Sequence, residues 1–192
     1  MSWKIYDEQQ IIVDSGKRML QKDLTRRSWG NISVRGKDGL MYITPSSIDY
    51  GDILLGDISS ISMEGEVLNG NRKPSMEKDL HRLIYLNRPD VNAVIHTHPV
   101  YSKVFACLGE NLPLIIDEAK YIFTGDVICA EHGEIGSMDL AEKALAALGD
   151  NMACLLKDHG AVCVGKDIDE AFKVAEILEY MAQIYYMMRS IK

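Results

Sequence analysis

The sequence predicts an α+β fold in three layers (α/β/α), with helices flanking a central, mostly antiparallel sheet. Two observations support this class. Short apolar or alternating segments are joined by tight turns, which is typical of antiparallel strands. Segments with helical spacing precede, interrupt and follow them. No repeat or linker-like stretch divides the chain, so we expect a single domain over residues 1–192.

The first part of the chain is predicted to form a helix followed by four strands. Residues 8–25 carry apolar side chains at helical intervals. Residues 32–35 alternate between apolar and polar side chains, and residues 40–43 follow a Lys-Asp-Gly turn. Residues 58–62 face residues 67–68 across a Glu-Gly turn. We therefore expect neighbouring strands here to be antiparallel.

The second part is predicted to alternate helices and strands. A helix over 76–87 has Ser75 as its N-cap and ends near Pro89, and residues 91–96 form a buried strand. The remaining predicted elements are a helix beyond Pro99, a helix over 138–148 capped by Ser137, strands over 153–156 and 161–164, and a long helix from Asp167 or Asp169 to about Arg189.

Composition and charge exclude several classes of function. The 192 residues are 47% hydrophobic and 26% charged, which is typical of a folded, soluble protein. The net charge of −7 argues against a nucleic-acid partner. The charged N-terminus and the lack of a long apolar stretch predict no membrane association and a cytoplasmic location. The four cysteines form no Cys-x-x-Cys pair, and we interpret them as buried thiols.

Three histidines and one glutamate form a candidate metal site. His96 and His98 end a predicted strand, where positions i and i+2 face the same side. His159 lies in a turn between two later strands, which strand pairing could bring alongside; each histidine alone could equally be structural. With Glu77 as a carboxylate in the first turn of a helix, the set would suit Zn²⁺ or a similar divalent ion. His81 could support this site, but we favour a surface or core role for it.

Small, polar turns form a candidate anion-binding site. Hydroxyl groups, an amide and the free N–H groups at a helix start can bind a phosphate without a lysine. The chain lacks the two common glycine-rich nucleotide loops, so nucleotide binding is not expected. The candidate substrate-binding residues are Gly30, Asn31, Ser46, Ser47, Ser75 and Met76.

Six groups of residues occur in one order along most of the chain. They are Gly30-Asn31-Ile32-Ser33, Thr44-Pro45-Ser46-Ser47, Lys73-Pro74-Ser75-Met76-Glu77, His81, the segment from Arg88 through His96-Thr97-His98-Pro99, and Asp158-His159-Gly160. Together they closely resemble the class II aldolase/adducin family, and within it the L-fuculose-1-phosphate aldolases.

The resemblance implies a metal centre and an assembly. One Zn²⁺ per chain, or another divalent ion, would be held by His96, His98 and His159, with Glu77 near or on the ion. The anion site would bind the phosphate of a small-molecule sugar phosphate. Members of the family are usually homotetramers with active sites at subunit interfaces, so His132 would act as a catalytic residue at a neighbouring chain's ion.

The resemblance also implies a reaction. A class II (zinc-dependent) aldehyde-lyase would reversibly cleave a ketose 1-phosphate, similar to fuculose 1-phosphate, into dihydroxyacetone phosphate and a small aldehyde through a zinc-stabilised enediolate. Glu77 would shuttle the proton. His132 stands where these aldolases carry a tyrosine, and it would either keep the acid/base role or only shape a loop. Ser47 and Met76 replace a glycine and a serine that are common in the family.

Other activities in the same family remain open. An L-ribulose-5-phosphate 4-epimerase is an alternative, although Glu77 stands where those enzymes carry Asp. A methylthioribulose-1-phosphate dehydratase keeps a glutamate at this position and is a second alternative. A scaffold without activity, similar to adducin, is disfavoured because all four candidate ligands are present.

Overall fold

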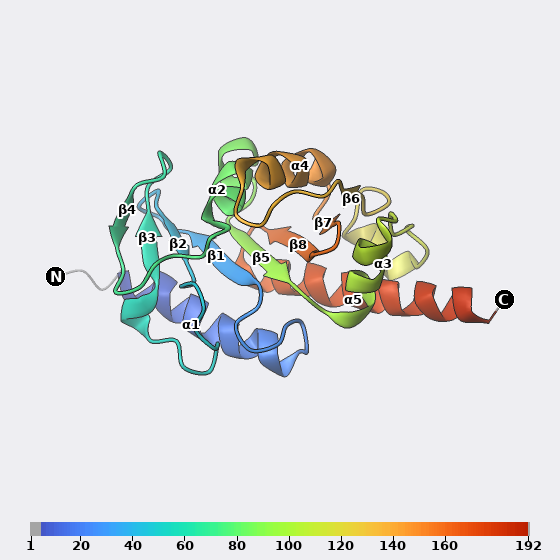
Figure 1. The fold of residues 1–192 in the computed structure, drawn as a ribbon, viewed down its shortest axis with the longest axis horizontal. Coiled ribbons are helices and arrows are strands. Elements are labelled where there is room, and N and C mark those ends of the chain that lie inside the picture. The colour runs from blue at the N-terminus through green and yellow to red at the C-terminus, as the bar shows by residue number, and fades with distance from the viewer. Residues whose placement is uncertain (1–4, 192) are drawn as a thin grey trace.

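The computed structural model describes residues 5–191, in which an eight-stranded sheet lies between two layers of helices (Figure 1). Helices α1, α3 and α5 pack on one face of the sheet, and α2 and α4 pack on the other. The predicted α+β class with three layers is confirmed. The helices are α1 (Ile5–Gln21), α2 (Lys78–Asn87), α3 (Val100–Leu108), α4 (Met138–Leu148) and α5 (Ile168–Ser190), with short 3-10 helices η1 (Leu55–Asp57) and η2 (Asp117–Tyr121).

The strands follow the order β4-β3-β2-β1-β5-β8-β7-β6 across the sheet. All neighbouring pairs are antiparallel except β6 and β7, which are parallel. The short strand β6 is absent from the sequence prediction. The strands are β1 (Asn31–Arg35), β2 (Met41–Ile43), β3 (Ser59–Ile61), β4 (Val67–Asn69), β5 (Ala93–Thr97), β6 (Cys129–Ala130), β7 (Ala153–Leu156) and β8 (Gly160–Gly165).

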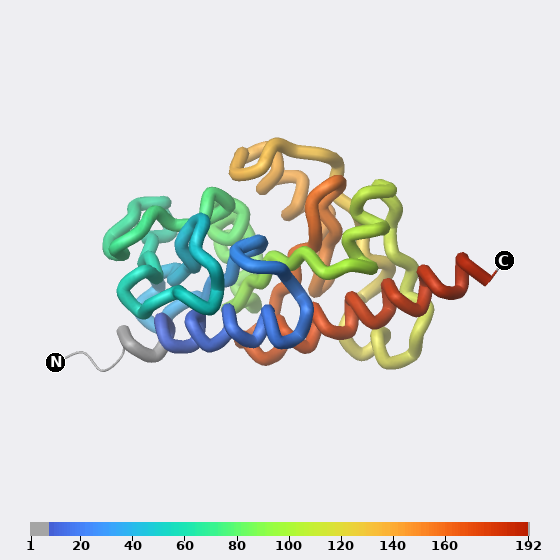
Figure 2. The backbone as a smooth tube through the Cα atoms, turned by 60° about the horizontal axis from the view of Figure 1, so that its bottom comes forward, coloured from blue at the N-terminus to red at the C-terminus, as the bar shows by residue number. Residues whose placement is uncertain are grey.

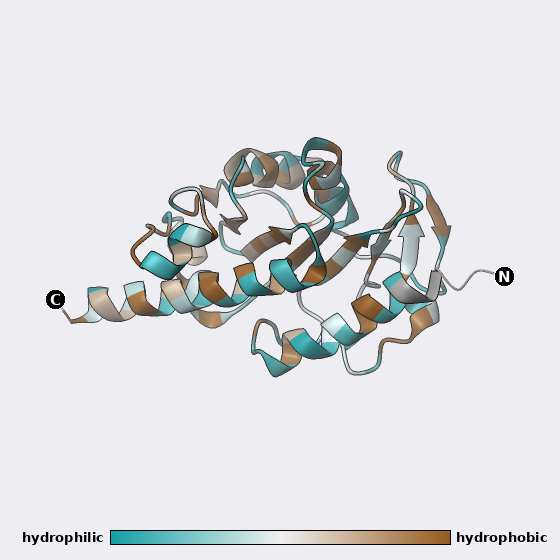
Figure 3. Ribbon diagram, turned by 180° about the vertical axis from the view of Figure 1, so that it is seen from behind, coloured by the Kyte–Doolittle hydropathy of each residue, from teal (hydrophilic) through white to brown (hydrophobic). Residues whose placement is uncertain are grey.

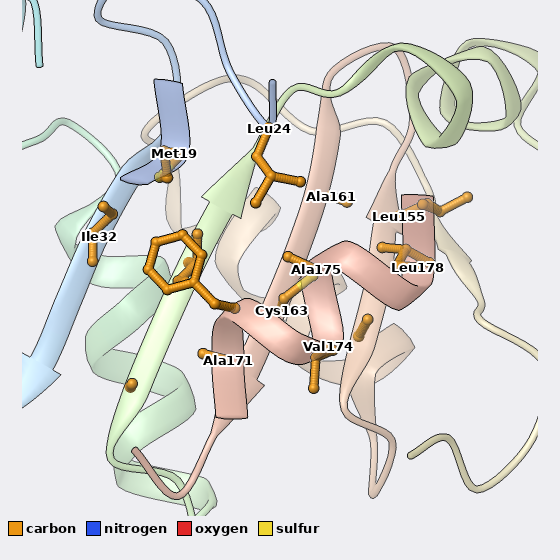
Figure 4. Close-up of a cluster of buried hydrophobic side chains, with 14 of the residues drawn as sticks. Met19, Leu24, Ile32, Leu155, Ala161, Cys163, Ala171, Val174, Ala175 and Leu178 are labelled. Atoms are coloured by element: carbon orange, nitrogen blue, oxygen red, sulfur yellow. The ribbon is translucent and has the colours of Figure 1, made fainter. Parts of the chain in front are cut away.

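Successive side chains of the central strands point to opposite faces of the sheet, so the apolar core consists of two clusters, one on each face. Ile95 of β5 and Cys163 of β8 pack with α1, α3 and α5, whereas Val94 and Val162 pack with α2 and α4. Figure 4 shows part of the first cluster, in which α5 side chains meet the sheet. Hydrophobic residues concentrate on these central strands (Figure 3). The middle of the sheet is thus buried on both of its faces.

Helices α1 and α5 follow one another across the same face of the sheet (Figure 2). Ion pairs join them, from Arg18 to Asp169 and from Lys22 to Glu176. These pairs are partly exposed, so each contributes at most about 1 kcal/mol to folding. Within residues 5–191, no helix is both long enough and apolar enough to cross a membrane.

The start of α2 differs from the sequence prediction. The helix begins at Lys78, and Ser75 is not its N-cap. The Ser75 N–H donates to the carbonyl oxygen of Thr44 at 3.0 Å, because this segment runs beside the end of β2, and the Ser75 Oγ accepts from the N–H of Glu77 at 3.2 Å. Glu77 takes the N-cap position without a side-chain cap hydrogen bond, so its carboxylate is free to turn elsewhere.

The other predicted caps are confirmed, but the cysteine prediction is partly wrong. Ser137 accepts from the N–H of Leu140 at 3.1 Å, and Asp167 accepts from that of Glu170 at 2.8 Å. Two cysteines are buried, one is half-buried and one is exposed at the end of α3. In that order they are Cys154, Cys163, Cys129 and Cys107.

Candidate active site

Strand pairing brings three distant segments to one edge of the sheet. Strand β1 begins at Asn31, which is the register partner of His96 near the end of β5. On the other side of β5, Thr97 is paired with Ala161 at the start of β8. Because both pairs are antiparallel, the end of β5 meets the turn that precedes β8, which carries His159.

The three predicted histidine ligands converge at this edge. His96 Nε2 lies 2.8 Å from His98 Nε2 and 3.2 Å from His159 Nε2. His96 Nδ1 donates to the carbonyl oxygen of Ala161 at 2.9 Å, which leaves its Nε2 lone pair free for an ion. Nitrogens about 2.0–2.1 Å from a tetrahedral Zn²⁺ lie roughly 3.3 Å apart, so the cluster has the size of a three-histidine zinc site.

The protonation of the histidines also suits a metal ion. Burial, followed by the neighbouring histidines, lowers the pKa of His98 to about 2. The same two causes lower the pKa of His159 to about 4. Both rings are therefore neutral at neutral pH and can donate lone pairs.

Glu77 lies beside the cluster in a buried position. Its Oε2 accepts a hydrogen bond from Asn31 Nδ2 at 2.7 Å and lies 3.4 Å from His96 Nε2. Burial raises the pKa of Glu77, but His96, His159 and the Asn31 amide together outweigh burial and hold the pKa below its ordinary value. Oε1 is buried without a hydrogen-bond partner in the described part of the chain. An ionised carboxylate with one free oxygen fits a site that a divalent ion or a substrate proton completes.

A pocket of about 310 Å³ opens over these residues. All six predicted substrate-binding residues line it, together with Glu77, His98 and His159. Its lining contains no lysine or arginine, so an anion there would be bound by hydroxyl and N–H groups. Trp29 and Ile135 also line the pocket, and sequence reasoning missed both.

Backbone conformation explains two of the lining residues. Gly30 has φ +75°, and a Cβ there would lie 2.3 Å from the carbonyl oxygen of His96. Only glycine therefore allows β1 to approach β5 at this point. Ser47 has φ 62°, in the left-handed region that favours glycine. The family that the sequence resembles commonly has glycine at this position.

Comparison with known proteins decides the family. The model of the class II aldolase and adducin N-terminal domain matches residues 10–186. The chain belongs to the class II aldolase and adducin family. The solved structure of an L-fuculose 1-phosphate aldolase is similar with a TM-score of 0.93 at 36% identity, covering 96% of this chain and 87% of that one.

Two curated members of the family are also similar to this chain. A 5-deoxy-D-ribulose 1-phosphate aldolase of Bacillus thuringiensis is 40% identical over 188 residues, which cover 96% of this chain and 86% of that protein. An L-fuculose phosphate aldolase of Methanococcus maripaludis is 38% identical over 164 residues, covering 85% and 87%. Both relatives are named as aldolases, but the sugar phosphates in their names differ.

His132 is the one predicted site residue of this aldolase-family chain that lies outside both the pocket lining and the histidine cluster. Its side chain is 65% exposed, and its Nδ1 lies 3.6 Å from Asp158 Oδ2. Its carbonyl oxygen accepts from Lys143 Nζ at 2.7 Å, which ties the loop to α4. Within one chain, His132 does not join the histidine cluster.

His81 is connected to the site through Asn31, a supporting role that the sequence leaves open but does not favour. It is completely buried, and its Nε2 forms a hydrogen bond with Asn31 Oδ1. The surface alternative for His81 is therefore wrong, and the core alternative is right. The spacing of four residues from Glu77 is the signal that keeps a supporting role for His81 open in the sequence, although the surface and core roles are favoured there.

Proposed function

We propose that this member of the class II aldolase family is a metal-dependent sugar-phosphate aldolase. It would reversibly cleave a ketose 1-phosphate into dihydroxyacetone phosphate and a small aldehyde. The observation that carries the proposal is the buried, ionised Glu77 beside the three convergent histidine nitrogens, at the base of a pocket lined by hydroxyl groups. Retro-aldol cleavage needs these functions together: charge stabilisation, a proton carrier and an anchor for the phosphate.

The histidines supply the metal ligands in this proposal. His96, His98 and His159 would hold one divalent ion, for which we propose Zn²⁺. Such an ion stabilises the negative charge that develops on the ketone side of the substrate when the carbon–carbon bond breaks. The hydrogen bond from His96 Nδ1 to Ala161 keeps that ring oriented toward the other two.

Glu77 is the proton carrier. During condensation its free oxygen, Oε1, would remove a proton from the carbon of dihydroxyacetone phosphate, while a second acid/base group gives one to the new hydroxyl. During cleavage that group would take the hydroxyl proton, and Glu77, protonated from water, would give its proton to the carbon. The Asn31 amide holds the other oxygen and thereby sets the direction of Oε1. The low pKa of Glu77 keeps the resting group ionised, as a base for condensation requires.

The serine-lined side of the pocket is the phosphate anchor. Ser46 and Ser47 lie in one turn, and Ser75 approaches from the segment before α2. Gly30 and Met76 complete the wall with backbone groups. Binding the phosphate here would orient the reacting carbons toward Glu77, so binding energy far from the reaction contributes to its rate.

The assembly is part of the same proposal. We propose a domain over 1–192 that forms a homotetramer, with His132 of each chain serving a neighbouring pocket as a second acid/base group. Exposed apolar side chains on the second half of α5 support association, among them Tyr180, Met187 and Met188. Light scattering of the purified protein tests the tetramer.

A panel of substrates tests the activity. The relatives suggest L-fuculose 1-phosphate and 5-deoxy-D-ribulose 1-phosphate, both of which release dihydroxyacetone phosphate, with lactaldehyde and acetaldehyde respectively. We expect release with Zn²⁺, Co²⁺ or Mn²⁺ and its loss on chelation. Interconversion of L-ribulose 5-phosphate, or dehydration of methylthioribulose 1-phosphate, without release of dihydroxyacetone phosphate from any ketose 1-phosphate would overturn the proposal.

A further inference from the structure

Five polar side chains form a buried row between β1 and α2. Asn31 and Ser33 are two residues apart in a strand, so they face the same side of the sheet. Glu77, His81 and Tyr85 are four residues apart along α2 and its N-cap, so they lie on one side of the helix. None of these residues is more than 6% exposed.

Hydrogen bonds connect the whole row. Tyr85 Oη lies 2.8 Å from Ser33 Oγ, which lies 2.7 Å from His81 Nδ1. His81 Nε2 bonds to Asn31 Oδ1, and Asn31 Nδ2 bonds to Glu77 Oε2 at 2.7 Å. The row therefore leads from the interior of the α2 layer to the carboxylate in the pocket.

The chemistry of the groups fixes the position of each proton. An ionised carboxylate only accepts, so Asn31 must present its NH₂ group to Glu77 and its oxygen to His81. Because that oxygen also only accepts, His81 must carry its proton on Nε2. Nδ1 then accepts from the hydroxyl of Ser33, and Ser33 accepts from Tyr85. Burial lowers the pKa of His81 to about 3, so the ring is neutral at neutral pH.

We propose that His81 is a positioning residue for Glu77, acting through the side-chain amide of Asn31. This inference rests on the proposed aldolase function. The Nε2 proton of His81 holds the amide in the one orientation that offers a donor to Glu77 Oε2. The reversed amide would set its oxygen against a carboxylate oxygen, and two acceptors repel each other. His81 thereby keeps Oε2 engaged and Oε1 available for proton transfer.

The proton on His81 can be observed without measuring activity. In ¹⁵N-labelled wild-type protein, long-range ¹H–¹⁵N NMR spectra distinguish the two neutral ring forms from the charged ring. The His81 signals are assigned by their loss in His81→Gln. We expect the neutral form with its proton on Nε2 at pH 7, both as purified and after chelation. A neutral ring with its proton on Nδ1 would overturn the proposal, because Nε2 would then be an acceptor and the Asn31 amide would lose the donor that fixes it.

A matched pair of variants tests the consequence for the reaction. His81→Gln can place an amide N–H near the position of Nε2, whereas His81→Asn reaches only the position of Nδ1. The readouts are ion content, KM for dihydroxyacetone phosphate, and kcat for exchange of its carbon-bound proton with solvent deuterium. We expect His81→Gln to stay close to wild type. We expect His81→Asn to lose roughly 10–100-fold in kcat, with KM and ion content unchanged.

The outcomes separate this inference from the function on which it rests. Wild-type protein that exchanges no proton refutes the proposed function. Exchange by wild type with an equal kcat for His81→Asn refutes the positioning role alone, and so does an equal loss in both variants. If His81→Asn does not fold, the NMR result on the wild-type protein still decides where the proton lies.

Discussion

Glu77 is the residue on which the proposed chemistry depends most directly. A carboxylate that is only 6% exposed is costly to keep ionised, and this one is held by an amide donor and neighbouring imidazoles. Glutamine has the same shape but cannot accept a proton from carbon. The residue therefore allows a test in which geometry is kept and only proton transfer is removed.

The first prediction concerns Glu77→Gln. We expect a loss of roughly 10²–10⁴-fold in the exchange of the dihydroxyacetone phosphate proton with solvent deuterium, because the proton carrier is gone. Mass spectrometry of the recovered substrate measures the exchange. Glu142→Gln, at an exposed position on α4, is the matched control and should exchange at the wild-type rate. Wild-type exchange in Glu77→Gln would rule out this role.

The second prediction concerns the histidine cluster. We expect about one divalent ion per chain in the wild-type protein and a large loss of ion from His96→Ala and His159→Ala, since each removes one of three ligands. Elemental analysis after dialysis measures the ion. His132→Ala should keep it, because His132 lies outside the cluster within its own chain. Full ion content in both ligand variants would contradict the site.

Local sequence patterns could find the individual ligands, whereas their convergence is expected from the family resemblance. His96 and His98 follow from the alternation of a strand, which is a local property of the sequence. Their approach to His159 requires β5 to pair with β8, and no local pattern specifies that pairing. Trp29 and Ile135 line the pocket through loop conformations that composition does not encode.

At the scale of elements, α3 begins with an unusual cap. Pro99 occupies the N-cap position, where its side chain cannot accept a hydrogen bond. Glu179 of α5 takes over this task, accepting from the N–H groups of Tyr101 at 2.7 Å and Ser102 at 2.8 Å. A side chain from one helix thus completes the hydrogen bonding of another.

The third prediction follows from this contact between helices. Glu179→Ala should lower the free energy of unfolding by about 1–2 kcal/mol, the usual cost of losing an N-cap. Glu179→Gln should lose less, because its amide oxygen still accepts. Urea unfolding of both variants measures the difference. Glu142→Ala serves as the control on an exposed helix surface, and a loss equal to that of Glu179→Ala would argue against capping.

The helix predictions show where local reasoning succeeds and fails. Ser137 and Asp167 cap their helices as predicted, each accepting from the N–H three residues later. Ser75 also accepts a local hydrogen bond at its Oγ, from the N–H of Glu77, but the preceding Pro74 forms a bridge with Pro45 after β2. The regular helix begins only at Lys78, with Glu77 at its N-cap position.

At the scale of the whole molecule, buried histidines couple folding to pH. The pKa of His81 falls from 6.5 to about 3 in the folded chain, chiefly through burial. The unfolded chain therefore binds a proton below pH 6.5 that the folded chain does not. Stability from this residue is fully present above pH 6.5 and is lost as pH falls toward 3.

The fourth prediction states this loss in numbers. In metal-free protein between pH 6.5 and 5, the wild-type free energy of unfolding should fall more steeply than that of His81→Gln. The difference in slope should approach about 1.4 kcal/mol per pH unit toward the lower end of that range. Urea unfolding at several pH values measures both slopes. Identical slopes would mean that His81 is already able to bind a proton in the folded chain.

The three-layer class could be predicted from the sequence, but the order of its strands could not. Period-two and helical patterns identify most elements, and turns such as that around Gly39 join neighbouring strands. The parallel strand β6 has only two residues and depends on β7 for its existence. Such an element arises from assembly of the sheet rather than from local preference.

The row between β1 and α2 has a practical consequence for enzyme engineering. Its members belong to a strand, a helix and the residue that opens that helix, and none belongs to the turns that carry Ser46 and Ile135. The lining of the pocket and the support of the reactive carboxylate can therefore be altered separately. Libraries confined to those turns can be screened for altered binding of sugar phosphates while the carboxylate keeps its native hydrogen bonds.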